Sequence, residues 1–92
     1  MVEKTVVVTN RLGLHARAAA QLVSTANRFS SQVRIERLDQ SATADAKSIL
    51  SVLMLAASRG TELRLIADGA DENEAIVALA SLVSSGFGEA IL

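Results

Sequence analysis

Four short stretches of the chain have the pattern of strands, either because they are rich in β-branched residues or because apolar and polar residues alternate along them. These stretches span residues 2–9, 32–38, 41–44 and 61–67. In the first, Val6 and Val8 share one face, because successive side chains of a strand point to opposite sides. The third has the least strand character, since alanine and aspartate are poor strand formers. The pattern predicts four strands.

Three longer stretches predict helices, and the first and third repeat apolar residues at the i, i+3, i+4, i+7 spacing of a helix with one buried face. They span residues 16–27, 48–59 and 71–84. We expect Ser48 to be the N-cap of the second helix and Gly60 to follow its end in a left-handed cap. Asp71 and Glu74 have the spacing of a capping box at the start of the third. Residues 87–92 are expected to form a short tail.

These elements give the order βαββαβα. Helices and strands that each have one apolar face are typical of an α+β fold in which one sheet carries its helices on a single side. A chain of 92 residues has the length of one domain, so residues 1–92 are predicted to share one modest core. The two phenylalanines are the only aromatic residues, so aliphatic side chains must fill that core.

The second predicted helix is unusually apolar. Between Ile49 and Ala57 the only polar residue is Ser51, which is too little for a helix that buries a single stripe. The pattern alone leaves two interpretations open. The core takes the whole helix, or part of it faces a partner.

Composition argues against several functional classes. A net charge of −1 gives no electrostatic footprint for nucleic acid. No basic segment precedes an apolar stretch at the N-terminus, and no run approaches the ~18–20 apolar residues of a membrane span, so neither a signal peptide nor membrane insertion is expected. The absence of cysteine fits a cytoplasmic protein. Helix-start preferences explain the acidic residues at 71–74, and no metal site is predicted.

The chain's only histidine, His15, falls where the first strand gives way to the first helix. Gly13 permits a sharp turn there, and the first amides of a helix have no intrahelical acceptor. Their positive end binds anions, and Arg17 adds a planar charged fork suited to phosphate. This pattern suggests a histidine that carries a phosphoryl group. Spacing alone also allows an ordinary capping or surface histidine.

Two motifs carry a family resemblance over essentially the whole chain. The segment Asn10-x-x-Gly13-Leu14-His15-Ala16-Arg17 resembles the active-site motif of the HPr family, the histidine phosphocarriers of the bacterial phosphotransferase system. Lys47-Ser48-Ile49 resembles that family's regulatory serine motif. The resemblance implies an open-faced β-sandwich, with a four-stranded antiparallel sheet and three helices on one face.

The resemblance also implies a mechanism. His15 would accept phosphate through Nδ1 from enzyme I and pass it to a IIA-type component, without a cofactor or metal. The phosphoryl group would lie over the backbone amides of Ala16 and Arg17, with the Arg17 side chain as a clamp. Such a protein is modified stoichiometrically and is a carrier more than a turnover enzyme. Many family members have proline where this chain has Ala18, which bears on transfer rates.

Ser48 has two interpretations. It is a suitable N-cap, and the resemblance makes it a site for an HPr kinase/phosphorylase, where phosphate would weaken docking by adding negative charge. The same resemblance places Ile49, Leu50 and Leu53 on the docking face beside His15.

Further alternatives stay open. The ending Ser85-Gly86-Phe87 resembles carriers of the nitrogen-related regulatory branch, whereas Lys47-Ser48-Ile49 favours the sugar type. A third possibility is an adaptor that acts through the docking face and Ser48 without transferring phosphate, against which His15 argues. A monomer is expected.

Overall fold

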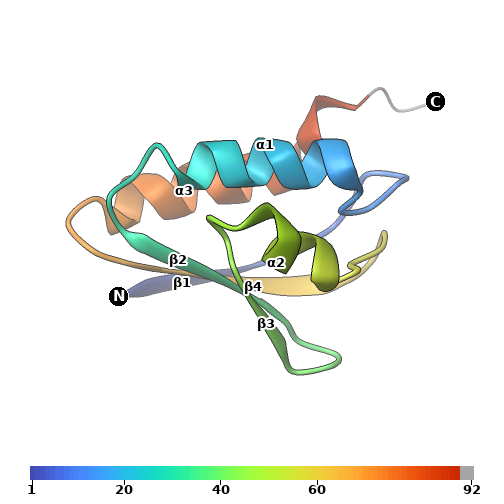
Figure 1. The fold of residues 1–92 in the computed structure, drawn as a ribbon, viewed down its shortest axis with the longest axis horizontal. Coiled ribbons are helices and arrows are strands. Elements are labelled where there is room, and N and C mark those ends of the chain that lie inside the picture. Colours follow the sequence, from blue (N-terminus) through green and yellow to red (C-terminus); the bar gives the residue numbers. More distant parts are fainter. Residues whose placement is uncertain (90–92) are drawn as a thin grey trace.

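The computed structural model describes residues 1–89 and has the expected order of strands and helices (Figure 1). The elements are β1 (Val2–Val7), α1 (Ala16–Ala26), β2 (Gln32–Arg37), β3 (Ala42–Asp45), α2 (Ile49–Met54), β4 (Glu62–Asp68), α3 (Glu72–Ser84) and the short 3₁₀ turn η1 (Gly86–Gly88). Most bounds differ from the predicted ones by one or two residues. Within residues 1–89, no helix combines the length and apolar character that a membrane crossing requires.

The four strands form one antiparallel sheet in the order β1-β4-β2-β3. Val6 lies opposite Leu63, and Ile35 lies between Leu65 of β4 and Ala44 of β3. The helices cover one face of this sheet, which confirms the predicted open-faced arrangement (Figure 1). Because β4 is central, the chain must cross from β3 through α2 to reach it.

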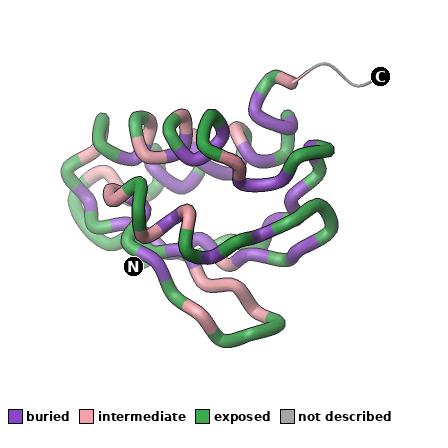
Figure 2. The backbone as a smooth tube through the Cα atoms, turned by 45° about the vertical axis from the view of Figure 1, so that its right-hand side comes forward, coloured by how far each residue is buried: buried purple, intermediate pink, exposed green. Residues whose placement is uncertain are grey.

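The core lies between the sheet and the helices, and buried and exposed positions alternate along the backbone as the pattern predicted (Figure 2). Its largest fully buried side chains are aliphatic: Leu22, Ile35, Leu63, Leu65, Leu79, Val8, Val33, Val52 and Val83. Burying each such side chain contributes roughly 1.5–3 kcal/mol. Val23 of α1 is only partly buried and packs against the core's edge.

The second helix is shorter than predicted. We expected it to reach residue 59, but α2 ends at Met54 with Leu55 as its C-cap. The side chain of Arg37 donates to the carbonyls of Leu55 and Ala56, at 2.9 and 3.0 Å, and Ala56 has a left-handed φ of 50°. These carbonyls are therefore satisfied from outside the helix, and the chain leaves helical geometry there.

The predicted capping box at α3 is wrong. Asp71 is the N-cap residue, but its side chain makes no cap hydrogen bond. Its carboxylate accepts instead from the backbone of Ser30 and Ser31 and from the Ser31 hydroxyl. Glu72 provides the local contact, with its carboxylate accepting from the backbone N–H of Gly69 at 3.2 Å. Contacts with the α1–β2 connection thus replace the local cap.

Candidate functional site

A loop held by a backbone hydrogen bond to Ala57 brings His15 to the start of α1. Gly13 has a φ of 65°, and a Cβ there would lie 2.5 Å from the carbonyl oxygen of Ala57. The next residue, Leu14, is buried and donates its N–H to that same oxygen at 2.9 Å. Only glycine allows this close approach together with a positive φ. His15 then follows in extended conformation as the N-cap of α1.

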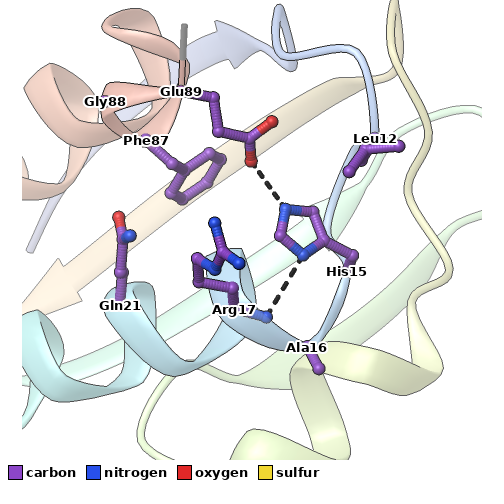
Figure 3. A pocket seen from close by; sticks show the side chains of 8 residues that line it. All are labelled: Leu12, His15, Ala16, Arg17, Gln21, Phe87, Gly88 and Glu89. Carbon is purple, nitrogen blue, oxygen red and sulfur yellow. Dashed lines mark hydrogen bonds and ion pairs between the residues drawn. The ribbon is translucent and has the colours of Figure 1, made fainter.

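Two contacts fix the imidazole ring of His15 (Figure 3). Its Nδ1 accepts the backbone N–H of Arg17 at 3.2 Å, and its Nε2 lies 2.6 Å from Oε2 of Glu89. In a neutral imidazole one nitrogen donates and the other accepts. The backbone amide can only donate, so Nδ1 holds the lone pair and Nε2 carries the proton. The His15 side chain stays 25% exposed, which leaves the ring accessible from solvent.

Glu89 was missed by sequence reasoning, which placed it in the tail 87–92. The tail prediction is wrong for residues 87–89, and residues 90–92 lie outside the described part of the chain. Gly86, Phe87 and Gly88 have positive φ values of 68°, 58° and 71°, and they turn the chain after α3. The sequence held one signal of this turn: Phe87, one of two phenylalanines in the chain, lies between two glycines. The structure shows that Phe87 is buried.

The carboxylate of Glu89 is held as an acceptor. The hydrogen bond from His15 is the largest influence and lowers the pKa of Glu89, assisted by the Asn10 hydrogen bond and the charge of Arg17. Asn10 directs its Nδ2 to both Glu89 Oε2, at 3.1 Å, and the Gly13 carbonyl, at 2.7 Å. Asn10 links the loop, the carboxylate and thereby the ring.

An open pocket of about 610 Å³ lies beside the ring (Figure 3). It is lined by Leu12, His15, Ala16, Arg17, Gln21, Phe87, Gly88 and Glu89. The guanidinium of Arg17 points into it, and Ala16 and Arg17 are both exposed. The first hydrogen bond of α1 runs from the Ala19 N–H to the His15 carbonyl. The backbone N–H groups of residues 16–18 therefore have no acceptor within the helix. The predicted residues His15, Ala16 and Arg17 therefore meet at one pocket.

The other predicted residues lie on α2 and do not line this pocket. Ser48 is the N-cap of α2, as expected, and its hydroxyl accepts the backbone N–H of Ser51 at 3.3 Å. Ile49 and Leu50 are exposed, by 44% and 66%, whereas Leu53 packs against the core. The helix is thus divided between core and solvent. Within residues 1–89, no group of three or more potential ligands could hold a metal ion.

Comparisons with known proteins show the family of this chain. The family model described as "PTS HPr component phosphorylation site" matches residues 2–85. The phosphocarrier protein HPr of Pseudomonas aeruginosa is 48% identical over 84 residues, which cover 91% of this chain and 92% of that protein. The HPr of Cupriavidus necator is 46% identical over 89 residues, covering 97% and 98% of the two chains.

Solved structures show the same fold. The crystal structure of HPr-C-His from Thermoanaerobacter tengcongensis superimposes with a TM-score of 0.93 at 45% identity, over 99% of this chain and 100% of that one. HPr from Bacillus anthracis gives a TM-score of 0.84 at 40% identity, over 89% and 95%. With the family model matching most of its length, this chain belongs to the HPr family of phosphotransferase-system phosphocarriers.

Proposed function

We propose that His15 is the phosphoryl acceptor of this chain. It takes the phosphoryl group from phosphorylated enzyme I, which phosphoenolpyruvate has charged. It then passes the group to IIA-type components for sugar uptake and regulation. The observation that carries the proposal is that Nδ1 of His15, at the start of α1, accepts the backbone N–H of Arg17. Its single contact, with the Arg17 amide, is 3.2 Å long, at the weak end of the hydrogen-bond range. An incoming phosphorus can displace such a contact at small cost.

The step itself exchanges one bond for another. The Nδ1 lone pair forms a bond to phosphorus as the N–P bond of the donor histidine breaks, and that bonding pair stays with the donor. Catalysis in such transfers rests mainly on positioning and on stabilising the charged oxygens. In this proposal the backbone N–H groups of Ala16 and Arg17, at the start of α1, receive these oxygens once phosphorus has displaced the Arg17 contact, and the Arg17 guanidinium faces the same pocket.

The arrangement favours a carrier over a tight binder. The pocket is open, and the groups around the phosphoryl site are exposed rather than enclosed. Contacts of this kind are screened by water and contribute modestly. A phosphoryl group held in this way keeps the capacity to move to the next protein.

The direct test is incubation with enzyme I and phosphoenolpyruvate, followed by intact-mass measurement. We expect one added phosphoryl group that is lost in acid, because phosphate on nitrogen is acid-labile whereas a serine ester persists. The matched control is His15→Ala, which should show no addition. An acid-stable addition, or an addition to His15→Ala, would place the phosphate elsewhere and contradict the proposal.

Regulation and docking belong to the same proposal. We assign Ser48 as the residue that an HPr kinase/phosphorylase would modify, and Ile49, Leu50 and Leu53 as docking residues. The support is the position of Ser48 at the start of α2, next to the exposed Ile49 and Leu50. A phosphate there adds about −1.5 to −2 charges beside an apolar surface. Incubation of wild type and Ser48→Ala with such a kinase and ATP tests the assignment: no addition to wild type contradicts it.

The proposed partners imply a cytoplasmic location, and the net charge of −1 argues against binding of nucleic acid. We expect a monomer, although the HPr of Thermoanaerobacter tengcongensis has a structure described as a dimer, with a TM-score of 0.76 to this chain. Size-exclusion chromatography with light scattering distinguishes the two states.

A further inference from the structure

The contact between Glu89 and His15 involves the ring nitrogen that the proposed transfer does not use. Nε2 lies 2.6 Å from Oε2 of Glu89, and the side chain of this glutamate is only 19% exposed. The carboxylate of Glu89 also accepts from Asn10, at 3.1 Å. Two separate donors therefore converge on one oxygen, which defines the position of the carboxylate relative to the ring.

The chain holds Glu89 in place through an unfavourable backbone conformation. Phe87 has φ 58° and ψ 26°, a left-handed conformation that is unfavourable for a bulky residue. Its side chain is buried, with 3% of the residue exposed, and anchors the turn of residues 86–88 on the core. Backbone strain in native proteins persists where the surrounding structure fixes it, and it gathers at functional sites. Here the strained turn delivers the next charged side chain to His15.

Asn10 is oriented for the same contact. Its Oδ1 is buried with no hydrogen-bond partner among the described residues, whereas its Nδ2 serves both Gly13 and Glu89. A buried oxygen without a partner is unfavourable. The opposite amide orientation would place that oxygen against the carbonyl of Gly13 and the carboxylate of Glu89. The donors of Asn10 thus determine its orientation.

We propose that Glu89 is a positioning residue for phosphoryl transfer, resting on the proposed function of His15: its carboxylate holds the proton on Nε2 and so leaves Nδ1 as the nucleophile. When Nδ1 bonds to phosphorus, the ring becomes a phosphorylated imidazolium that keeps the Nε2 proton. The carboxylate faces the positive charge that develops there. A carboxylate that orients an imidazole and stabilises its cation plays the same part in hydrolase triads.

The first test needs no phosphoryl donor. Nitrogen-15 NMR of the single histidine reports which ring nitrogen carries the proton. At a pH where the ring is neutral, wild type should show the Nε2–H form, and Glu89→Ala should show a mixture of both forms. Glu89→Gln keeps an acceptor oxygen without the charge and should retain the Nε2–H form. Glu74→Gln, exposed near the opposite end of α3, is the matched control.

The second test uses phosphoramidate, a small donor that needs no protein docking. Its P–N bond breaks as the ring nitrogen bonds to phosphorus, and ammonia leaves. Wild type should be modified at Nδ1. Glu89→Ala should give products at both ring nitrogens, separable by phosphorus NMR, because Nε2 is then neither occupied nor held protonated. We expect initial rates at Nδ1 to fall about tenfold in Glu89→Ala and less in Glu89→Gln, and to be unchanged in Glu74→Gln.

The outcomes separate the two proposals. If Glu89→Ala keeps the tautomer, the site of phosphorylation and the rate of wild type, the role of Glu89 is overturned and the phosphocarrier function stands. Failure of wild type to accept phosphate on His15 from both phosphoramidate and enzyme I overturns the function, while the NMR result still reports whether Glu89 holds the ring. Circular dichroism of each variant checks that the fold is kept.

Discussion

The carboxylate of Asp71 accepts hydrogen bonds from both the backbone N–H and the hydroxyl of Ser31, 40 residues earlier in the chain. The neighbouring N–H of Ser30 donates to the second carboxylate oxygen at 2.9 Å. This one side chain fastens the connection between α1 and β2 to the start of α3. The hydrogen bond from the Ser31 hydroxyl is the largest cause that lowers the pKa of Asp71 to about 2.

Asp71 should therefore make stability depend on acid. The pKa of Asp71 in the folded protein lies below the ordinary value of about 3.9, so the unfolded chain binds more protons between these two values. The stabilisation is therefore present above pH 4 and is lost as the pH falls through about 2. Asp71→Asn lacks the charge at every pH. We expect its urea midpoint to lie below that of wild type at pH 7 and the difference to shrink toward pH 2. The exposed Glu62→Gln serves as control. A difference that stays constant with pH contradicts this origin.

Gly13 supports a prediction about the loop before His15. In Gly13→Ala the new Cβ meets the Ala57 carbonyl oxygen at 2.5 Å, and the positive φ adds strain. Gly60 also has a positive φ, of 91°, but a Cβ at that residue would have no atom within 4 Å, so Gly60→Ala isolates the strain alone. We expect Gly60→Ala to lose about 1 kcal/mol of unfolding free energy and Gly13→Ala to lose clearly more. Urea denaturation measures both, and equal losses would show that the close approach does not matter.

The start of α1 offers a matched pair of proline substitutions. Ala18 lies in the first turn, where its N–H has no intrahelical acceptor, so Ala18→Pro removes no hydrogen bond. Ala20 lies further along the helix, where proline removes a bond and clashes with the preceding turn. We expect Ala20→Pro to cost about 3 kcal/mol or more and Ala18→Pro to stay within about 1 kcal/mol of wild type. Thermal unfolding followed by circular dichroism compares them; similar losses would contradict the assigned helix start.

Local patterns predicted the parts of the structure that depend on neighbours in sequence. Most strands and helices have one buried face, so the spacing of aliphatic residues along the chain was sufficient for the order and the layers. His15 and Arg17 were found for the same reason, because the N-cap and the first turn of α1 lie within three residues of each other. Ser48 as N-cap of α2 was another local inference that the structure confirms.

The failures come from contacts between distant residues. The end of α2 depends on Arg37, 18 residues before Leu55. The capping box failed because Ser31 takes the carboxylate of Asp71. Glu89 contacts His15, 74 residues earlier, because the turn before it places Phe87 in a left-handed conformation that glycine usually adopts. No periodicity in the sequence encodes these partners.

Docking can be tested with two apolar residues of nearly equal exposure. Leu50 on α2 is 66% exposed and Val77 on α3 is 67% exposed, so truncating either should change stability little. If α2 is the docking surface, Leu50→Ala removes apolar area that a partner would bury, and Val77→Ala does not. We expect Leu50→Ala to raise the KM for phosphoryl acceptance from enzyme I about three- to tenfold, which corresponds to roughly 0.6–1.4 kcal/mol.

Steady-state transfer with varied carrier concentration measures this effect. The rate with phosphoramidate should be unchanged in both variants, because that donor needs no docking. The comparison therefore separates a loss of docking from damage at His15. An equal rise in KM for Val77→Ala would mean that apolar exposure in general assists the encounter, and an unchanged KM for Leu50→Ala would move the docking surface away from this residue.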